Sequence, residues 1–189
     1  MFHVTRRDFL KSTAVAGLVA PAVAASKRSA TDLVTLGKTG VKVTRLAFGT
    51  GTFAGRLNRE MGQDAFTRNV RHAYDRGIRW FETADAYDQM HEMLAVALKG
   101  IPRDSIQLST KIRLREGDND PRAILDRVRK EMNTEYFDIV LMHGMGTANW
   151  PEEQKQLRDA LSEAKSKKIV RGITGNMPAI RADIKVFSL

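Results

Sequence analysis

The stretch Phe137-Asp138-Ile139-Val140-Leu141-Met142-His143 decides the fold, because it is a nearly continuous apolar run that ends on a polar residue. Such a run, rich in bulky and β-branched side chains, predicts a strand buried within a parallel sheet. Four other runs share this character, and the five expected strands are 43–48, 79–81, 106–108, 137–142 and 169–173. The residues that follow them are Gly49-Thr50, Glu82, Lys111, His143 and Thr174, at spacings of 33, 29, 32 and 31 residues. Each spacing is about the length of one strand-helix-strand unit.

Amphipathic helices are expected between these strands, at 64–77, 91–99, from 120 onward and at 152–165. Asp120 is a suitable N-cap, and Pro121 suits the first helical turn. In that third helix Ile124, Leu125, Val128 and Met132 form one apolar stripe. Alternating strands and helices predict an α/β fold whose parallel strands all end at one rim.

A small hairpin is expected ahead of the first strand. Segments 33–36 and 41–44 flank Gly37-Lys38-Thr39-Gly40, which is a typical turn composition. This hairpin is placed to close the bottom of a barrel.

The N-terminus has the pattern of an export signal. Thr5-Arg6-Arg7-Asp8-Phe9-Leu10-Lys11 precedes a short apolar run at 14–25, with Ala22-Val23-Ala24 as a small-residue cleavage site. The paired arginines indicate the twin-arginine route, an extracytoplasmic or periplasmic location, and membrane contact only during export. The apolar run is too short to form a helix that spans a bilayer. The alternative to an export signal is therefore an N-terminal amphipathic arm. We therefore divide the chain into a signal (1–25), a linker (26–32) and one domain (33–189).

Charge and cysteine content limit the function. The net charge is +9, and it falls to +7 if residues 1–25 are removed, because Arg6, Arg7 and Lys11 leave with Asp8. Most basic residues cluster on expected outer helix faces without interleaved aromatic residues, so we expect a solvated surface and no nucleic-acid partner. The chain has no cysteine, which excludes disulfides, thiolate metal ligands and a cysteine nucleophile.

Four residues at the expected rim together suggest proton-transfer chemistry. Glu82, Tyr87, Lys111 and His143 lie up to 61 residues apart in sequence but follow neighbouring strands. Taken singly, each is more simply a packing, exposed or hydrogen-bonded residue. Together, an ammonium can lower the pKa of the Tyr87 phenol, and a carboxylate can fix the ammonium. A histidine can donate a hydrogen bond to a substrate oxygen, as carbonyl reduction requires.

At these positions the sequence resembles the aldo-keto reductase family. The resemblance rests on residues 36–43, 81–87, 109–111 and 141–143, which match four family motifs in order: LGKTGVKV, FETADAY, STK and LMH. It implies a (β/α)₈ barrel of the TIM type that reduces a small carbonyl substrate, an aldehyde or ketone, with NADPH (NADP).

The resemblance also implies roles for individual residues. Tyr87 would be the general acid, Lys111 would tune its pKa, His143 would orient the carbonyl, and Glu82 would pair with the lysine. The cofactor would contact Gly49, Thr50, Thr174 and Asn176, and no metal is expected. The chain departs from the family in having Glu82 where the family has aspartate, and Thr174-Gly175-Asn176 where it commonly has Ser-Asn.

The sequence covers about five of the eight expected units, so we expect a fragment with weak or no activity. One alternative is a non-catalytic binding or scaffold protein derived from a reductase barrel. Another is a metal-dependent hydrolase that uses His91, His143, Glu82 and Asp85 as ligands.

Overall fold

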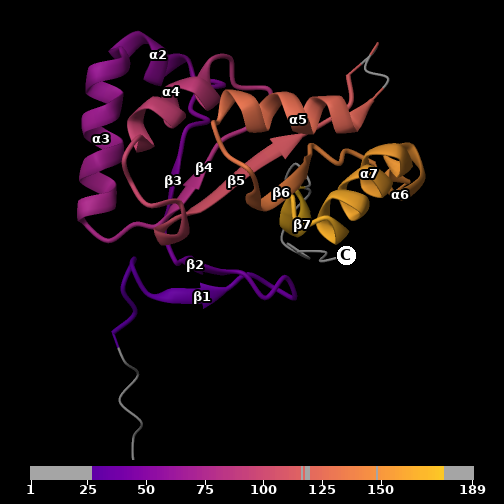
Figure 1. The fold of residues 1–189 in the computed structure, drawn as a ribbon, viewed down its shortest axis with the longest axis horizontal. Coiled ribbons are helices and arrows are strands. Elements are labelled where there is room, and N and C mark those ends of the chain that lie inside the picture. Colours follow the sequence, from indigo (N-terminus) through magenta and orange to yellow (C-terminus); the bar gives the residue numbers. More distant parts are fainter. Residues whose placement is uncertain (1–26, 116, 118–119, 148, 177–189) are drawn as a thin grey trace, which may run out of the picture.

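The computed structural model describes residues 27–115, 117, 120–147 and 149–176, which form a two-stranded hairpin and a five-stranded sheet with flanking helices (Figure 1). The hairpin and sheet strands are β1 (Leu33–Thr35), β2 (Lys42–Thr44), β3 (Ala47–Gly49), β4 (Trp80–Glu82), β5 (Gln107–Ile112), β6 (Phe137–His143) and β7 (Val170–Asn176). The helices are α2 (Arg56–Met61), α3 (Gln63–Asp75), α4 (Met90–Leu98), the 3₁₀ helix η1 (Arg103–Ser105), α5 (Pro121–Glu131), α6 (Trp150–Glu153) and α7 (Lys155–Ser166). The predicted export signal and everything after 176 lie outside the described residues. Within the part that is described, no helix has the length and apolar character needed to span a bilayer.

The main sheet has the order β3-β4-β5-β6-β7, and every neighbouring pair is parallel. This order follows the chain, as expected for successive strand-helix-strand units. In the described residues β3 and β7 are the outer strands and the sheet does not close on itself. The fold is therefore a partial (β/α) barrel, as the sequence predicted.

The hydrophobic core lies between the sheet and its helices. Side chains alternate between the two faces of a strand, and one set packs on the helices. That set includes Phe81, Leu108, Ile112, Val140, Met142 and Ile173, and the helices contribute Phe66, Val70, Leu94, Leu125, Val128, Leu157 and Leu161. By this alternation Glu82, Lys111 and His143 lie on the opposite face, which would be the interior of a barrel.

The single strand expected at 43–48 is wrong, because the structure has two strands there. β2 pairs antiparallel with β1, and β3 pairs parallel with β4. Between them, the Thr44 hydroxyl donates to Leu46 O at 2.8 Å and accepts from Arg79 N and Trp80 N, both at 3.2 Å. These bonds turn the chain from the hairpin into the sheet, and residues 45 and 46 are exposed.

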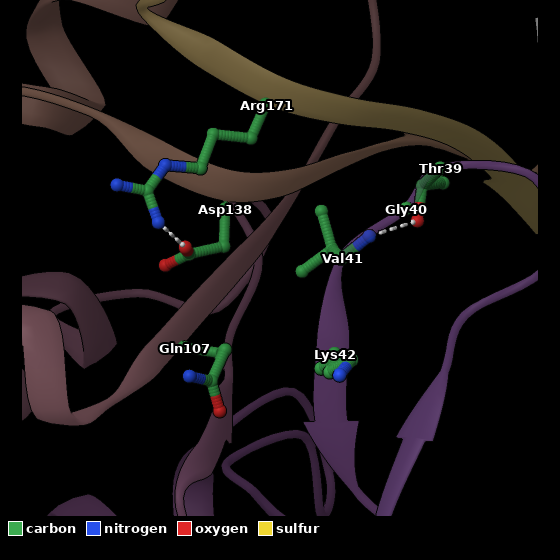
Figure 2. Close-up of a pocket in the computed structure, with 7 residues that line it drawn as sticks. All are labelled: Thr39, Gly40, Val41, Lys42, Gln107, Asp138 and Arg171. Atoms are coloured by element: carbon green, nitrogen blue, oxygen red, sulfur yellow. Dashed lines mark hydrogen bonds and ion pairs between the residues drawn. The ribbon is translucent and has the colours of Figure 1, made fainter.

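The hairpin lies across the end of the sheet at which the strands begin, as predicted. A Cβ atom on Gly172 of β7 would lie 2.9 Å from Thr39 Cβ, so the hairpin turn can approach the strand this closely only at a glycine. A cavity of about 400 Å³ remains between the hairpin residues 39–42 and Gln107, Asp138 and Arg171 (Figure 2). The hairpin thus covers this end of the sheet without filling it.

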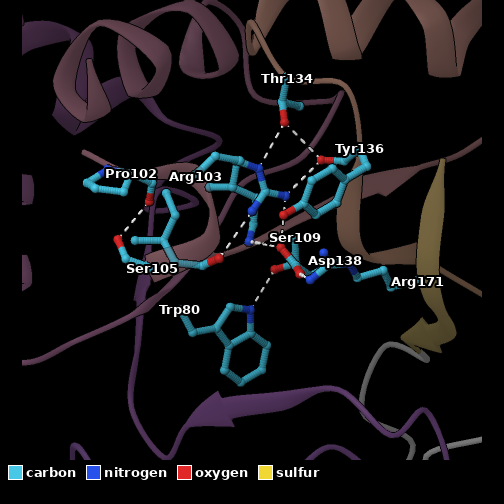
Figure 3. A network of polar contacts seen from close by, with 11 residues as sticks. Trp80, Pro102, Arg103, Ser105, Ser109, Thr134, Tyr136, Asp138 and Arg171 are labelled. Carbon is cyan, nitrogen blue, oxygen red and sulfur yellow. Dashed lines mark hydrogen bonds and ion pairs between the residues drawn. The ribbon is translucent and has the colours of Figure 1, made fainter. Parts of the chain in front are cut away.

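A buried carboxylate ties the strands together at the same end (Figure 3). Asp138 of β6 is 1% exposed. It accepts hydrogen bonds from Arg103 at 2.8 Å, Arg171 at 2.9 Å and the backbone N–H of Leu108 at 2.9 Å. The two guanidinium groups also lie 3.8 and 4.2 Å from the ring centroid of Tyr136. These contacts link η1, β5, β6 and β7.

Three predicted helices are found at nearly their expected bounds, as α3, α4 and α5. The Asp120 side chain caps α5 by accepting from Arg122 N at 2.9 Å, with Pro121 in the first turn, as predicted. The helix expected at 152–165 is found as α7, but it begins later than expected, because Gln154, with φ of −109°, separates it from the short helix α6. The short helix α2 was not predicted; it has no buried residue, so no apolar stripe marked it.

We expect Asp138→Asn to lower the free energy of unfolding by about 2–3 kcal/mol, because it leaves two arginines without their countercharge. Urea denaturation followed by circular dichroism measures this change. Asp126→Asn, which removes the exposed partner of Arg129, is the matched control and should cost less than about 0.5 kcal/mol. Equal losses in the two variants would contradict a special role for Asp138.

Candidate functional site

The carboxyl ends of the parallel strands bring the predicted residues to one rim. Gly49 pairs with Glu82, and Glu82 with Ser109. Lys111 pairs with Leu141, Leu141 with Thr174, and His143 with Asn176. Residues from all five strands of the sheet therefore lie at the same end, as the repeat predicted.

Lys111 is the centre of the polar cluster. Its ammonium forms an ion pair with the Glu82 carboxylate and donates a hydrogen bond to Tyr87 Oη at 3.1 Å. The side chains of Lys111 and Glu82 are only 12% and 19% exposed. Burial lowers the pKa of Lys111 from 10.5 to about 8, so the group is still mainly charged at neutral pH. The extra methylene of Glu82 therefore does not prevent contact between its carboxylate and the lysine.

Tyr87 is held by the segment that follows β4. Thr83 N donates to Ser109 O at 3.0 Å, and Asp85 N donates to Lys111 O at 2.9 Å, so this segment continues the pairing with β5. Burial raises the pKa of Tyr87 above its ordinary value of 10.0. The predicted lowering of this pKa by Lys111 is not found, because burial disfavours the charged phenolate.

His143 faces Tyr87 from the end of β6. The two rings are 6.0 Å apart, centroid to centroid, and nearly perpendicular at 89°. Burial lowers the pKa of His143, and the positive charges of Lys111 and Arg113 lower it further, against the opposing effect of Asp85. The imidazole is therefore neutral at pH 7. Its buried Nδ1 has no hydrogen-bond partner in the described part of the chain, so it is available to a bound molecule.

The segment after β3 forms another wall of this rim. Thr50 is fully buried; its N–H donates to Glu82 O at 3.1 Å, and its O accepts from Asn58 Nδ2 at 2.9 Å. The Thr50 hydroxyl itself has no partner in the described chain. A Cβ atom on Gly51 would lie 2.7 Å from Tyr87 Oη, so only a glycine fits beside the phenol. Gly51 and Asn58 were not predicted, although the Gly49-Thr50-Gly51 pattern was a signal for the former.

The two remaining cofactor candidates, Thr174 and Asn176, both lie in β7, and the structure describes the side chain of Thr174 but not that of Asn176. Thr174 is 5% exposed and lies within β7. The backbone of Asn176 pairs with His143, while its side chain lies outside the description.

The metal-ligand set considered from the sequence does not assemble. His91 is buried in α4, and its ring nitrogens contact Glu131 Oε2 at 3.1 Å and Thr110 Oγ1 at 2.9 Å. The Asp85 carboxylate pairs with Arg127 and Arg115. In the described ranges no three His, Cys, Asp or Glu side chains are grouped to hold a metal ion.

A parallel sheet with helices on one face and polar groups at its carboxyl-end rim is the architecture of (β/α)-barrel enzymes. The chain belongs to the aldo/keto reductase family, whose sequence pattern matches residues 45–174. It is 30% identical over 149 residues to Probable aldo-keto reductase 1 of Glycine max, covering 72% of this chain and 43% of that protein. It is also 30% identical over 134 residues to methylglyoxal reductase DkgB of Escherichia coli O157:H7, covering 67% of this chain and 46% of that protein.

A solved structure agrees with this assignment. The holo form of an aldo-keto reductase from Bacillus halodurans superposes with a TM-score of 0.63 at 26% identity, covering 80% of this chain and 51% of that one. The chain spans about half the length of the curated relatives it matches.

The pKa of Lys111 makes stability depend on pH. Because this pKa falls on folding, the folded chain binds fewer protons than the unfolded chain between pH 8 and 10.5, so the free energy of unfolding rises with pH across that window. Lys111→Met should show a smaller rise than the wild type between about pH 7.5 and 9.5. Urea denaturation at these pH values measures it. Lys167→Met, at the exposed C-cap of α7, should retain the wild-type slope, and a parallel slope in Lys111→Met would argue against the lowered pKa.

Proposed function

We propose that this site reduces an aldehyde or ketone to an alcohol with NADPH, and that Tyr87 is the proton donor. The observation that carries the proposal is the 3.1 Å hydrogen bond from Lys111 Nζ to Tyr87 Oη, with Glu82 on the other side of the ammonium. Family membership supports the reaction class.

The residues present fit a nicotinamide cofactor. The buried Thr50 hydroxyl lacks a partner in the described chain, and glycines at 49 and 51 leave room beside Glu82 and Tyr87. Gly49, Thr50, Thr174 and Asn176 are the residues that would hold the cofactor. When bound, a reduced nicotinamide supplies the hydride for the carbonyl carbon. The preference for NADPH over NADH rests on the family alone.

The protein's own groups then manage the proton. The raised pKa of Tyr87 keeps its hydroxyl protonated at neutral pH, ready to donate. As negative charge develops on the carbonyl oxygen, the Tyr87 O–H bond breaks and the alcohol O–H bond forms, which leaves a phenolate. The charged Lys111, 3.1 Å away, stabilises that phenolate, and Glu82 keeps the ammonium in place. A neutral His143 can donate one hydrogen bond to the same oxygen.

A small aldehyde is the first substrate to test. One relative is named as a methylglyoxal reductase, which suggests short oxoaldehydes for this chain as well.

Tyr87→Phe should reduce kcat/KM for methylglyoxal by about 10²- to 10⁴-fold, because it removes the proton donor. NADPH oxidation by the full-length protein measures turnover, and NADPH fluorescence measures binding, which should be unchanged. Tyr74→Phe, whose hydroxyl lies 3.2 Å from Ser105 Oγ, is the control and should keep full activity. A wild type that binds NADPH without turnover would instead favour the non-catalytic binding or scaffold role.

We also propose export by the twin-arginine route, supported by Arg6-Arg7 and the apolar run at 14–25. Replacing both arginines with lysine should leave the protein uncleaved in the cytoplasm, as cell fractionation and mass spectrometry would detect. Export of this double variant at the wild-type level would contradict the route.

A further inference from the structure

The segment that carries Tyr87 is anchored by one buried carboxylate. Between Thr83 and Tyr87 the chain reads Ala84-Asp85-Ala86, so Asp85 is the only one of these three residues whose side chain can make a polar contact. Its side chain is 4% exposed and pairs with Arg127 of α5 and with Arg115, the latter at 3.4 Å. The position of Tyr87, two residues further on, therefore depends on what holds Asp85.

Through Arg127, a chain of side-chain contacts connects Asp85 to β5, the strand that carries Lys111. The second arm of its guanidinium donates to Glu131 Oε1 at 2.6 Å, and Glu131 Oε2 lies 3.1 Å from His91 Nδ1. His91 Nε2 lies 2.9 Å from Thr110 Oγ1, and Thr110 precedes Lys111 in β5. We call the set Asp85, Arg127, Glu131, His91 and Thr110 the outer clamp.

The protonation of the clamp follows from burial. Burial lowers the pKa of His91 to about 4, with Arg127 adding to this and the negative charges of Asp85 and Glu92 opposing it. The imidazole is thus neutral at pH 7. Glu131 accepts from Nδ1–H, and the Thr110 hydroxyl donates to Nε2. Every link of the clamp has one donor and one acceptor.

We infer that Arg127 is a positioning residue that sets the distance between Tyr87 Oη and Lys111 Nζ. The clamp and the hydrogen bond from Asp85 N to Lys111 O at 2.9 Å close a ring of contacts that joins the segment carrying Tyr87 to the strand carrying Lys111. One side of the ring is the segment 83–87 and the other is β5. For its effect on catalysis the inference rests on the proposed function.

The other arginines of α5 show that this arrangement is specific. Arg122 pairs with the exposed Glu163 of α7, and Arg129 pairs with Asp126 and Glu135. In the part of the chain that the structure describes, neither contacts the segment that carries Tyr87. Arg122 therefore provides a matched control on the same helix.

The test compares Arg127→Gln with Arg122→Gln in the full-length protein. The first readout is the titration of Tyr87, followed by phenolate absorbance; the chain has three tyrosines, and the Tyr87→Phe difference isolates this one. In Arg127→Gln the released segment should expose Tyr87 and shift its titration toward pH 10, while Arg122→Gln should titrate as the wild type.

The second readout is methylglyoxal reduction, in which Arg127→Gln should lower kcat about 10-fold with little change in KM. Arg127→Lys, which can reach one carboxylate but not both, should be intermediate.

The two readouts separate failure of the inference from failure of the proposed function. A wild type without turnover would sink the proposed function, while the tyrosine titration would still decide the inference. If Arg127→Gln titrates and turns over like Arg122→Gln, the positioning role is overturned. If Arg127→Gln does not fold, Arg127→Lys takes its place, because it keeps a positive charge beside Asp85 but cannot bind Glu131 as well. A Tyr87 titration and a kcat unchanged by Arg127→Lys would then overturn the role.

Discussion

Parallel pairing of β4, β5 and β6 is the constraint on which the site depends. Because Glu82 pairs with Ser109 and Lys111 pairs with Leu141, their register fixes how far each strand extends toward the rim. A slip of one residue would turn the Lys111 side chain onto the helix-facing side of the sheet. The helices and the hairpin hold this register, and the site follows from it.

Burial sets the electrostatics of the rim more than any single charge does. It lowers the pKa of Lys111 and His143 and raises that of Tyr87, so each group is driven toward its neutral form. Two of these forms suit a proton donor: a protonated phenol and a neutral imidazole. Lysine is the exception, since a charged ammonium is needed beside the phenol, and Glu82 is the countercharge in contact with it. The pairing of Glu82 with Lys111 therefore opposes the tendency imposed by burial.

The sequence was sufficient to predict the parallel sheet, the hairpin and the convergence of Glu82, Tyr87, Lys111 and His143, because these follow from apolar periodicity and strand order. It could not show that segment 43–48 divides into two strands, since the side-chain bonds of Thr44 that turn the chain join residues about 35 positions apart. Nor could it give the direction of the Tyr87 pKa shift, which depends on packing. The partner of Asp85 was also hidden, because Arg127 lies among several similar basic residues of one helix.

At each end of the sheet a buried aspartate pairs with two arginines, but the consequences of the two pairings differ. At one end Asp138, which lies in β6, binds two arginines of other elements. The strand β6 is already fixed by backbone pairing on both sides. At the other end Asp85, which lies outside the strands, binds two arginines, and the backbone of its segment is bonded to β5 on one side. Loss of the first pairing should therefore cost mainly stability, because the strand keeps its neighbours. Loss of the second should displace Tyr87 before it unfolds the protein, because backbone bonds tie that segment to β5 on one side and the Asp85 ion pairs hold it on the other.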